Sequence, residues 1–242
     1  MKEYVRIRDM VLILASNSPR RRQILALGGW QFLVQAAEVD EQVLPGEDPR
    51  QYVLRLAECK ARAIAPRASE GSYVIAADTT VVDGIHLESR QPPVILAKPK
   101  DEDEAITMLR QLRGRAHHVL TGLVVLKISD QDAAMASEVV TTEVQMRSYS
   151  EEEMRAYVAS GDPLDKAGAY AIQHIGFHPV ERVEGCYANV VGLPLCALTR
   201  MLAKFGAPAA SEVARRCQAA APGDPCAVAP LLGDQVSARP PN

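Results

Sequence analysis

Three consecutive arginines stand directly behind a Ser-Pro pair, and this arrangement is the strongest chemical signal in the chain. Arg20, Arg21 and Arg22 follow Ser18 and Pro19, two residue types that are typical of the N-cap and the first position of a helix. A helix N-terminus exposes unpaired N–H groups and carries a partial positive charge, so cations beside it favour an anion such as phosphate. An ordinary helix start with solvated or ion-paired arginines fits the same residues equally well.

Two acidic positions could activate water or hold a metal ion. Asp78 ends the apolar run VIAAD, where a carboxylate costs free energy unless a metal ion or a lysine accompanies it. Glu38, with Asp40 and Glu41 nearby, offers the hard oxygen ligands that suit Mg²⁺ or Mn²⁺. Simpler interpretations remain open, because Asp78 could cap a turn at a strand end and EVDE could be a solvated acidic loop.

The composition favours a small anionic ligand over a polymer. With 242 residues, of which 48% are hydrophobic and 24% charged, the chain can bury a substantial core, and one α/β domain with appendages is the expected organisation. A net charge of −3 gives no general attraction to nucleic acid or to an anionic membrane. We therefore expect neither as a partner.

The cysteine pattern and the N-terminal residues favour a cytoplasmic location. The five cysteines show no CxxC spacing, and an odd number argues against a closed disulfide framework. The segment MKEYVRIRDM is charged, and the apolar run that follows it is broken by Ser16 and Asn17. No signal peptide and no membrane span are indicated.

Strands and helices are expected to alternate along the chain and to position the candidate residues. The hydrophobic patterns predict strands over 11–15, 30–41, 72–84, 117–128 and 137–149, and helices that begin near residues 18, 48, 101, 150 and 195. Ser150 and Glu153 match a capping box. The glycine-rich stretch 162–194 has little periodicity and is expected to be rich in loops.

Three segments follow from these patterns. Residues 1–10 form an N-terminal extension, residues 11–206 form the main domain, and residues 207–242 are rich in Ala and Pro and lack aromatic residues. Their composition predicts a mobile tail, within which SEVARRCQAA could form a short helix.

Seven short motifs occur in an order that resembles the Maf family of nucleoside triphosphate pyrophosphatases. They are SNSPRRR, EVDE, the Lys60 of an ECKA stretch, AADTTV, a Lys-Pro pair, DKAGAYAIQ and VVGLP, and the resemblance covers about residues 11–206. The resemblance implies an elongated mixed α/β sheet with flanking helices, similar to that of the inosine triphosphate pyrophosphatases, and a central cleft. It also implies dependence on Mg²⁺ or Mn²⁺, a nucleoside triphosphate substrate and a homodimer.

The same resemblance assigns expected roles to individual residues. Asp78 would be the catalytic base and Glu38 a metal ligand. Lys60 and Lys98 would hold phosphate oxygens, although each could be an ordinary surface lysine. The nucleotide would be bound by Ser16, Ser18, Arg20, Arg21, Thr79 and Gln173. This chain has Ala97 where the family usually has Gly before Lys-Pro, which would cost roughly 1 kcal/mol if that position needs a positive φ.

Three positions favour one of the two main Maf subfamilies. Arg20, Thr79 and Gln173 resemble those of the dTTP and UTP pyrophosphatases, whereas the subfamily that prefers 7-methyl-GTP has Trp, Gln and Glu there. A glutamine offers a donor and an acceptor to a pyrimidine edge. The alternatives are a 7-methyl-GTP pyrophosphatase, a non-catalytic nucleotide-binding regulator of septum formation, and a transferase. No GxxxxGK[ST] or GxGxxG fingerprint supports the transferase.

Overall fold

A seven-stranded mixed sheet runs through the protein. The computed structural model describes residues 11–84, 92–129, 134–207, 209 and 212–221. The strand order is β2-β1-β3-β5-β6-β7, with β4 paired to the end of β3. Strand β1 is parallel to β2 and β3, and the other pairs are antiparallel. The strands are β1 (Leu12–Leu14), β2 (Phe32–Val34), β3 (Tyr73–Asp83), β4 (Val94–Leu96), β5 (Ala116–Lys127), β6 (Ala134–Met146) and β7 (Val180–Glu184).

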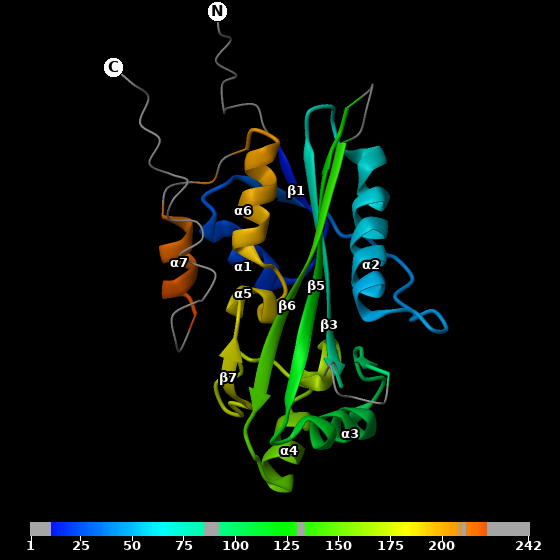
Figure 1. The fold of residues 1–242 in the computed structure, drawn as a ribbon, viewed down its shortest axis with the longest axis vertical. Helices are drawn as coiled ribbons and strands as arrows, with labels where there is room; N and C mark the ends of the chain where they lie inside the picture. Colours follow the sequence, from blue (N-terminus) through cyan, green and yellow to red (C-terminus); the bar gives the residue numbers. More distant parts are fainter. Residues whose placement is uncertain (1–10, 85–91, 130–133, 208, 210–211, 222–242) are drawn as a thin grey trace, which may run out of the picture.

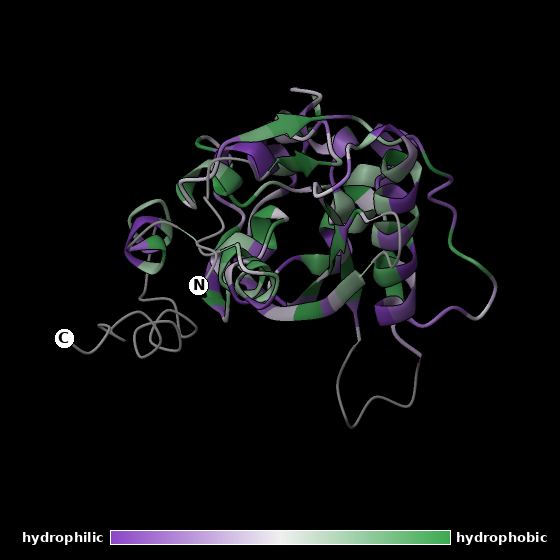
Figure 2. Ribbon diagram, turned by 90° about the horizontal axis from the view of Figure 1, so that it is seen from above, coloured by the Kyte–Doolittle hydropathy of each residue, from purple (hydrophilic) through white to green (hydrophobic). Residues whose placement is uncertain are grey.

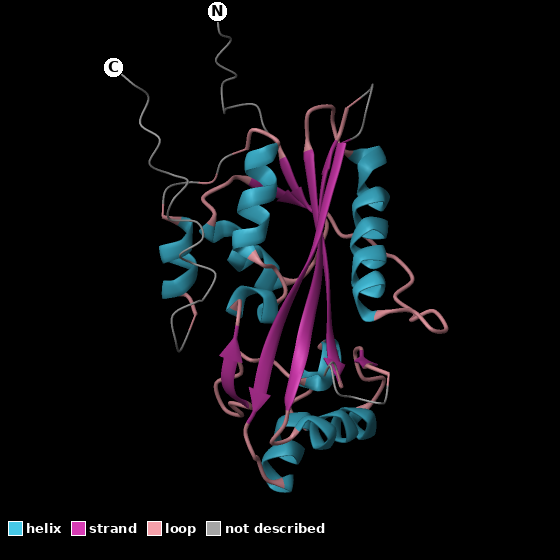
Figure 3. Cartoon of the chain, viewed as in Figure 1, coloured by secondary structure: helices cyan, strands magenta, loops and turns pink. Residues whose placement is uncertain are grey.

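Helices cover both faces of this sheet and one of its ends (Figure 1; Figure 3). Helix α2 lies on one face, α1, α5 and α6 lie on the other, and α3 and α4 lie at the far end of the long β5–β6 hairpin (Figure 1). The helices carry both hydrophilic and hydrophobic residues around the sheet (Figure 2). They are α1 (Pro19–Leu27), α2 (Pro49–Ile64), α3 (Glu102–Leu112), α4 (Glu151–Val158), α5 (Tyr187–Val191), α6 (Leu195–Lys204) and α7 (Val213–Ala219).

The alternation of side chains along β3 explains why both faces are covered. Ile75 and Ala77 pack into a core cluster with α1, α5 and α6, whereas Val74 and Ala76 pack into another cluster with α2. Successive side chains of a strand point to opposite faces, so an uninterrupted apolar run requires a layer on each side. The expected mixed α/β sheet with flanking helices is confirmed.

The expected helix starts are also confirmed. Ser18 and Asp48 cap α1 and α2, each with a proline at the first helical position, and Asp101 caps α3. Both hydrogen bonds of the predicted capping box are present between Ser150 and Glu153. The strand expected over 30–41 is shorter than predicted, because only Phe32–Val34 pair with β1. Residues 35–48 form a loop.

A glycine lets α2 approach the sheet closely. Gly122 on β5 pairs with Asp78 on β3, and a Cβ at Gly122 would lie 2.4 Å from the carbonyl oxygen of Val53 on α2. Any side chain at this position would push the helix away, since such a contact is far inside van der Waals distance. The close approach brings the buried face of α2 over the middle of β3.

Part of the segment that was expected to be a mobile tail is helical and packed. Helix α7 forms where the sequence allowed a short helix, and its apolar residues contact the main domain. Ala207, Val213 and Cys217 are at most 8% exposed and belong to the core cluster around α1 and α6. Burial of these apolar side chains stabilises the packed position of α7. Residues 1–10 and 222–242 lie outside the described residues. Within the described residues, no helix combines the length and apolar character needed to cross a membrane.

Candidate active site

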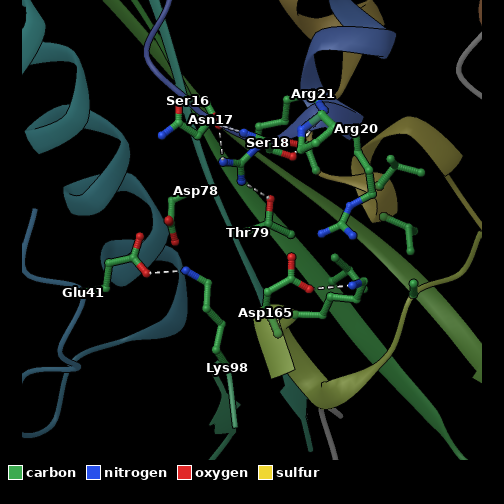
Figure 4. Close-up of a pocket in the computed structure, with 18 of the residues that line it drawn as sticks. Ser16, Asn17, Ser18, Arg20, Arg21, Glu41, Asp78, Thr79, Lys98 and Asp165 are labelled. Carbon is green, nitrogen blue, oxygen red and sulfur yellow. Dashed lines mark hydrogen bonds and ion pairs between the residues drawn. The ribbon is translucent and has the colours of Figure 1, made fainter. Parts of the chain in front are cut away.

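All ten residues that the sequence singled out line one cavity. Its volume is about 440 Å³, and it lies between the β1–α1 turn, the middle of β3 and the segment 165–173. The ten are Ser16, Ser18, Arg20, Arg21, Glu38, Lys60, Asp78, Thr79, Lys98 and Gln173. Figure 4 shows acidic and basic side chains converging on this space from separate elements.

A chain of ion pairs crosses one side of the cavity. The Nζ atom of Lys60 lies 2.6 Å from Oδ1 of Asp78 and 2.6 Å from Oε1 of Glu41. The Nζ atom of Lys98 lies 2.7 Å from the other oxygen of Glu41. Two carboxylates and two ammonium groups therefore alternate within contact distance. Figure 4 shows the pair of Glu41 and Lys98.

The surroundings of Asp78 and Lys60 exclude the simpler interpretations of both residues. Asp78 lies in the middle of β3, not at a strand end, and Lys60 lies on the buried face of α2; each residue is 7% exposed. A buried charge is tolerated when an opposite charge and hydrogen bonds accompany it. The close approach of α2 at Gly122 allows Lys60 to be the oppositely charged partner of Asp78.

Glu41, not Glu38, is the acidic residue at the centre of the network. Glu38 lines the cavity but is exposed, and it makes no hydrogen bond or ion pair within the described part of the chain. Burial alone would raise the pKa of Glu41, but hydrogen bonds and charge interactions with Lys60 and Lys98 lower this pKa to about 2. The EVDE motif lies on the loop that enters the cavity, and packing decides which of its acids joins the ion-pair network.

Helix α2 holds the loop that carries Glu41. The hydroxyl of the buried Tyr52 donates to the backbone carbonyl of Glu41 at 3.0 Å. Arg55, one turn further along α2, donates to the carbonyl of Gln42 and forms two contacts with Glu47. The position of Glu41 is therefore fixed through its backbone as well as through its carboxylate.

The alanine before Lys98 carries no backbone strain. Positive φ angles at non-glycine residues within the described part of the chain occur only at Ala169, His178 and Glu212, so Ala97 does not need the glycine that the family usually has there. Its carbonyl accepts a hydrogen bond from Gly168 N at 3.2 Å. Most of the long loop before it, residues 85–91, lies outside the described residues.

Arg21 is half-buried and is held by contacts with the protein, whereas Arg20 points into the cavity (Figure 4). The guanidinium of Arg21 donates from Nε to Gly192 O at 2.8 Å, from Nη1 to Ser16 Oγ at 3.4 Å and from Nη2 to Thr79 Oγ1 at 3.1 Å. Burial lowers the pKa of Arg21. Arg20 makes no hydrogen bond with the described residues, and Arg22 is exposed and does not line the cavity.

The two serines of the β1–α1 turn serve as hydrogen-bond acceptors. Ser16 Oγ accepts from Ser18 N at 3.2 Å and from Arg21, and Ser18 Oγ accepts from Arg21 N at 3.4 Å. A hydroxyl has one hydrogen to donate and two lone pairs. Both O–H hydrogens therefore remain available to an anion in the cavity.

Three further residues in or directly behind the cavity wall were not predicted from the sequence. Lys166 is buried and forms ion pairs with Asp162, at 2.9 Å, and with Asp165. Gly192, within VVGLP, supplies the carbonyl that holds Arg21. Thr121 on β5 contacts Thr79 Oγ1 at 2.9 Å. DKAGAY and VVGLP were visible as motifs, but nothing in the sequence connects Thr121 with the cavity.

The donor set fits a divalent metal ion that is shared with a substrate. Asp78 and Glu41 both direct a carboxylate oxygen to the position of Lys60 Nζ, and Mg²⁺ is often held by one or two carboxylates together with phosphate oxygens. Within the described residues no group of three or more His, Cys, Asp or Glu could hold a metal ion by itself. The site therefore suits an ion completed by a phosphate ligand.

Comparison with known proteins gives a consistent family match. The family model described as Maf-like protein matches residues 11–205. The chain is 46% identical over 197 residues to the dTTP/UTP pyrophosphatase of Anaeromyxobacter dehalogenans strain 2CP-1. The aligned region covers 81% of this chain and 95% of that protein. It is 44% identical over 196 residues to the dTTP/UTP pyrophosphatase of Geobacter sulfurreducens, covering 81% of this chain and 97% of that protein.

Two solved structures match the chain with low TM-scores. A dITP/XTP pyrophosphatase from Mycobacterium abscessus superposes with a TM-score of 0.39 at 14% identity, covering 81% of this chain and 94% of that one. The Ham1 protein of Staphylococcus aureus gives a TM-score of 0.37 at 15% identity, covering 70% and 79%. Such scores are too low to assign the fold by themselves.

Proposed function

The chain belongs to the Maf-like protein family, and we propose that it hydrolyses dTTP and UTP to the nucleoside monophosphate and pyrophosphate. Relatives named dTTP/UTP pyrophosphatase are 46% and 44% identical to it in sequence. The observation that carries the proposal is the alternation of Asp78, Lys60, Glu41 and Lys98 along one wall of a cavity whose other wall holds Arg20 and Arg21. A house-cleaning enzyme of this kind removes unwanted nucleotides.

The β1–α1 turn is proposed to hold the phosphate groups. Ser16 and Ser18 have O–H hydrogens to donate, and Arg20 has a guanidinium without a protein partner among the described residues. Arg21 uses three of its five N–H donors within the protein, which leaves two for phosphate oxygens. Fixed donors around a transferring phosphoryl group stabilise the charge that develops in the transition state.

The carboxylate wall is proposed to activate the attacking water. Asp78 would accept the proton of the water as it attacks the α-phosphorus, and Lys60 would balance the charge of this carboxylate and contact the departing pyrophosphate together with Lys98. Asp78 and Glu41 are the residues that would hold Mg²⁺ or Mn²⁺. When bound, such an ion neutralises phosphate charge and favours the ionised form of water.

Gln173 is proposed to recognise the base. It lies at the exposed rim of the cavity, far along the chain from the phosphate-binding turn. Its amide can donate to one atom of a pyrimidine edge and accept from another. Replacement by glutamate would leave a carboxylate facing a carbonyl oxygen, at a cost of about 1 to 3 kcal/mol.

Purified protein incubated with individual nucleoside triphosphates and Mg²⁺ or Mn²⁺ tests this function. Release of monophosphate and pyrophosphate from dTTP and UTP is the expected result. Transfer of a labelled group to an acceptor would indicate a transferase, and tight binding without products would indicate a regulator. A wild-type preference for 7-methyl-GTP would contradict the pyrimidine assignment but not the pyrophosphatase activity. In the variant Gln173→Glu, the ratio of kcat/KM for dTTP to kcat/KM for 7-methyl-GTP should be lower than in the wild type.

We propose a homodimer that acts in the cytoplasm, without nucleic acid or membrane as a partner, and a main domain that spans 11–206 and is extended by α7. Light scattering of the purified protein tests the dimer. A monomeric mass at micromolar concentration would contradict it.

A further inference from the structure

We infer that Thr121 is a positioning residue, which fixes the phosphate-binding guanidinium of Arg21 through the hydroxyl of Thr79. The inference rests on the proposed function, because the role of Arg21 toward phosphate belongs to that proposal. Thr121 lies opposite Thr79 in the β3–β5 ladder and is fully buried. It does not line the cavity.

The direction of each hydrogen bond follows from counting hydrogens. A threonine hydroxyl has one hydrogen to donate. Thr121 Oγ1 donates to the backbone carbonyl of Asn189 at 3.2 Å, since a carbonyl oxygen can only accept. The hydrogen between Thr121 Oγ1 and Thr79 Oγ1, 2.9 Å apart, must therefore come from Thr79.

This direction leaves Thr79 with lone pairs facing Arg21. Nη2 of Arg21 donates to Thr79 Oγ1 at 3.1 Å, and a hydroxyl whose hydrogen is committed elsewhere is a fixed acceptor. Thr79 thus has no hydrogen to give to a nucleotide. Its expected role as a substrate contact is replaced by a role in orienting Arg21, which sets it apart from Ser16 and Ser18.

A second contact to Arg21 originates from the same buried residues. Asn189 on α5 is fully buried and donates from Nδ2 to Val119 O and Thr142 Oγ1, at 3.0 Å each, so it holds α5 against β5 and β6. Helix α5 ends at Gly192, whose carbonyl accepts from Nε of Arg21. At Gly192, φ is +116°, and a Cβ would lie 3.3 Å from Thr79 Oγ1.

These contacts determine which donors face the cavity. With Nε, one hydrogen of Nη1 and one of Nη2 bound to protein, Arg21 presents one N–H from each terminal nitrogen. Two such donors match two oxygens of a phosphate. Without Thr121, the hydroxyl of Thr79 can rotate and donate elsewhere, and the guanidinium loses its fixed orientation.

The test compares Thr121→Val with Thr121→Ser. Valine keeps the shape but removes the hydroxyl, and we expect kcat/KM for dTTP to fall about tenfold while serine restores it to within about threefold. Thr80→Val is the matched control, because Thr80 is another buried threonine of the sheet, on β3, whose Oγ1 has no hydrogen-bond partner among the described residues. This control should keep wild-type kinetics. The melting temperatures of all variants distinguish a loss of folding from a changed orientation of the Arg21 guanidinium. If Thr121→Val does not fold, Thr121→Ala takes its place.

The double variant with Arg21→Ala decides between positioning and a general structural effect. If Thr121 acts through Arg21, Thr121→Val should change kcat/KM by less than about twofold once Arg21 is already absent. An equal loss in both backgrounds, or a loss in Thr80→Val as large as in Thr121→Val, would overturn the inference. Calorimetric binding of pyrophosphate to each variant keeps the test independent of turnover. A wild type that binds pyrophosphate but hydrolyses no nucleotide would refute the proposed function alone.

Discussion

The ammonium of Lys60 lies 2.6 Å from the carboxylate of Asp78, and the two residues are 7% exposed each. Lys60 comes from α2 and Asp78 from β3. Glu41 is a second counterion of Lys60 at the same distance. Removal of one carboxylate therefore leaves Lys60 with a partner, which reduces the cost that breaking a buried pair otherwise carries.

Asp78→Asn should lower turnover without unfolding the protein. An amide cannot accept the proton of the attacking water, so we expect kcat for dTTP to fall by at least about 100-fold. Asp83→Asn is a suitable control, because Asp83 is buried on the same strand but pairs with Arg115 outside the cavity. This control should lose stability and keep its kcat. Near-normal turnover of Asp78→Asn would remove Asp78 from the mechanism.

Glu41→Gln and Glu38→Gln separate the two candidate metal ligands. We expect Glu41→Gln to raise the Mg²⁺ concentration for half-maximal activity at least about tenfold, because an amide is a poorer ligand for a hard cation than a carboxylate. Glu38→Gln should have a smaller effect, since Glu38 is exposed and lies outside the ion-pair network. Titration with Mn²⁺ in the presence of nucleotide gives the same comparison without turnover. A larger effect of Glu38→Gln would restore Glu38 as the ligand.

The low pKa of Glu41 predicts a loss of stability in acid. Its pKa is about 2 in the folded protein, against an ordinary value of 4.5, so the folded state binds this proton less readily than the unfolded state. The stabilisation is complete above about pH 4.5 and is lost as the pH falls toward 2. We expect the difference in free energy of unfolding between wild type and Glu41→Gln to shrink over that interval in urea titrations. A difference that is constant with pH would contradict the assignment.

Helix α7 should contribute to stability. Val213 is 5% exposed in the core cluster, and Val213→Ala removes two buried methyl groups at a cost of about 1 to 2 kcal/mol. Arg215→Ala, at a position where the side chain is 79% exposed, should change the free energy of unfolding by less than about 0.5 kcal/mol. Chemical denaturation measures both. Truncation after Gly206 should lower the melting temperature, and equal stabilities of all variants would show that α7 does not contribute.

The local signals in the sequence determined most of the elements, and the resemblance to the Maf family named most of the cavity residues. Ser18, Asp48 and Ser150 cap the helices that they were expected to cap, because capping depends on residues two or three positions apart. Motifs spread over more than 150 residues all contribute to one cavity. Their residue types alone indicated phosphate, carboxylate and cation chemistry.

The tertiary structure decided which of these groups meet. Glu41 and not Glu38 entered the ion-pair network because Tyr52 and Lys60 of α2 fix its backbone and its carboxylate. Thr79 Oγ1 accepts a hydrogen bond from Arg21 and contacts Thr121, its neighbour across the sheet. Hydrogen-bond partners of this kind depend on strand register and on the distance between a helix and a sheet. Propensity and periodicity describe only neighbours along the chain, so they cannot specify such partners.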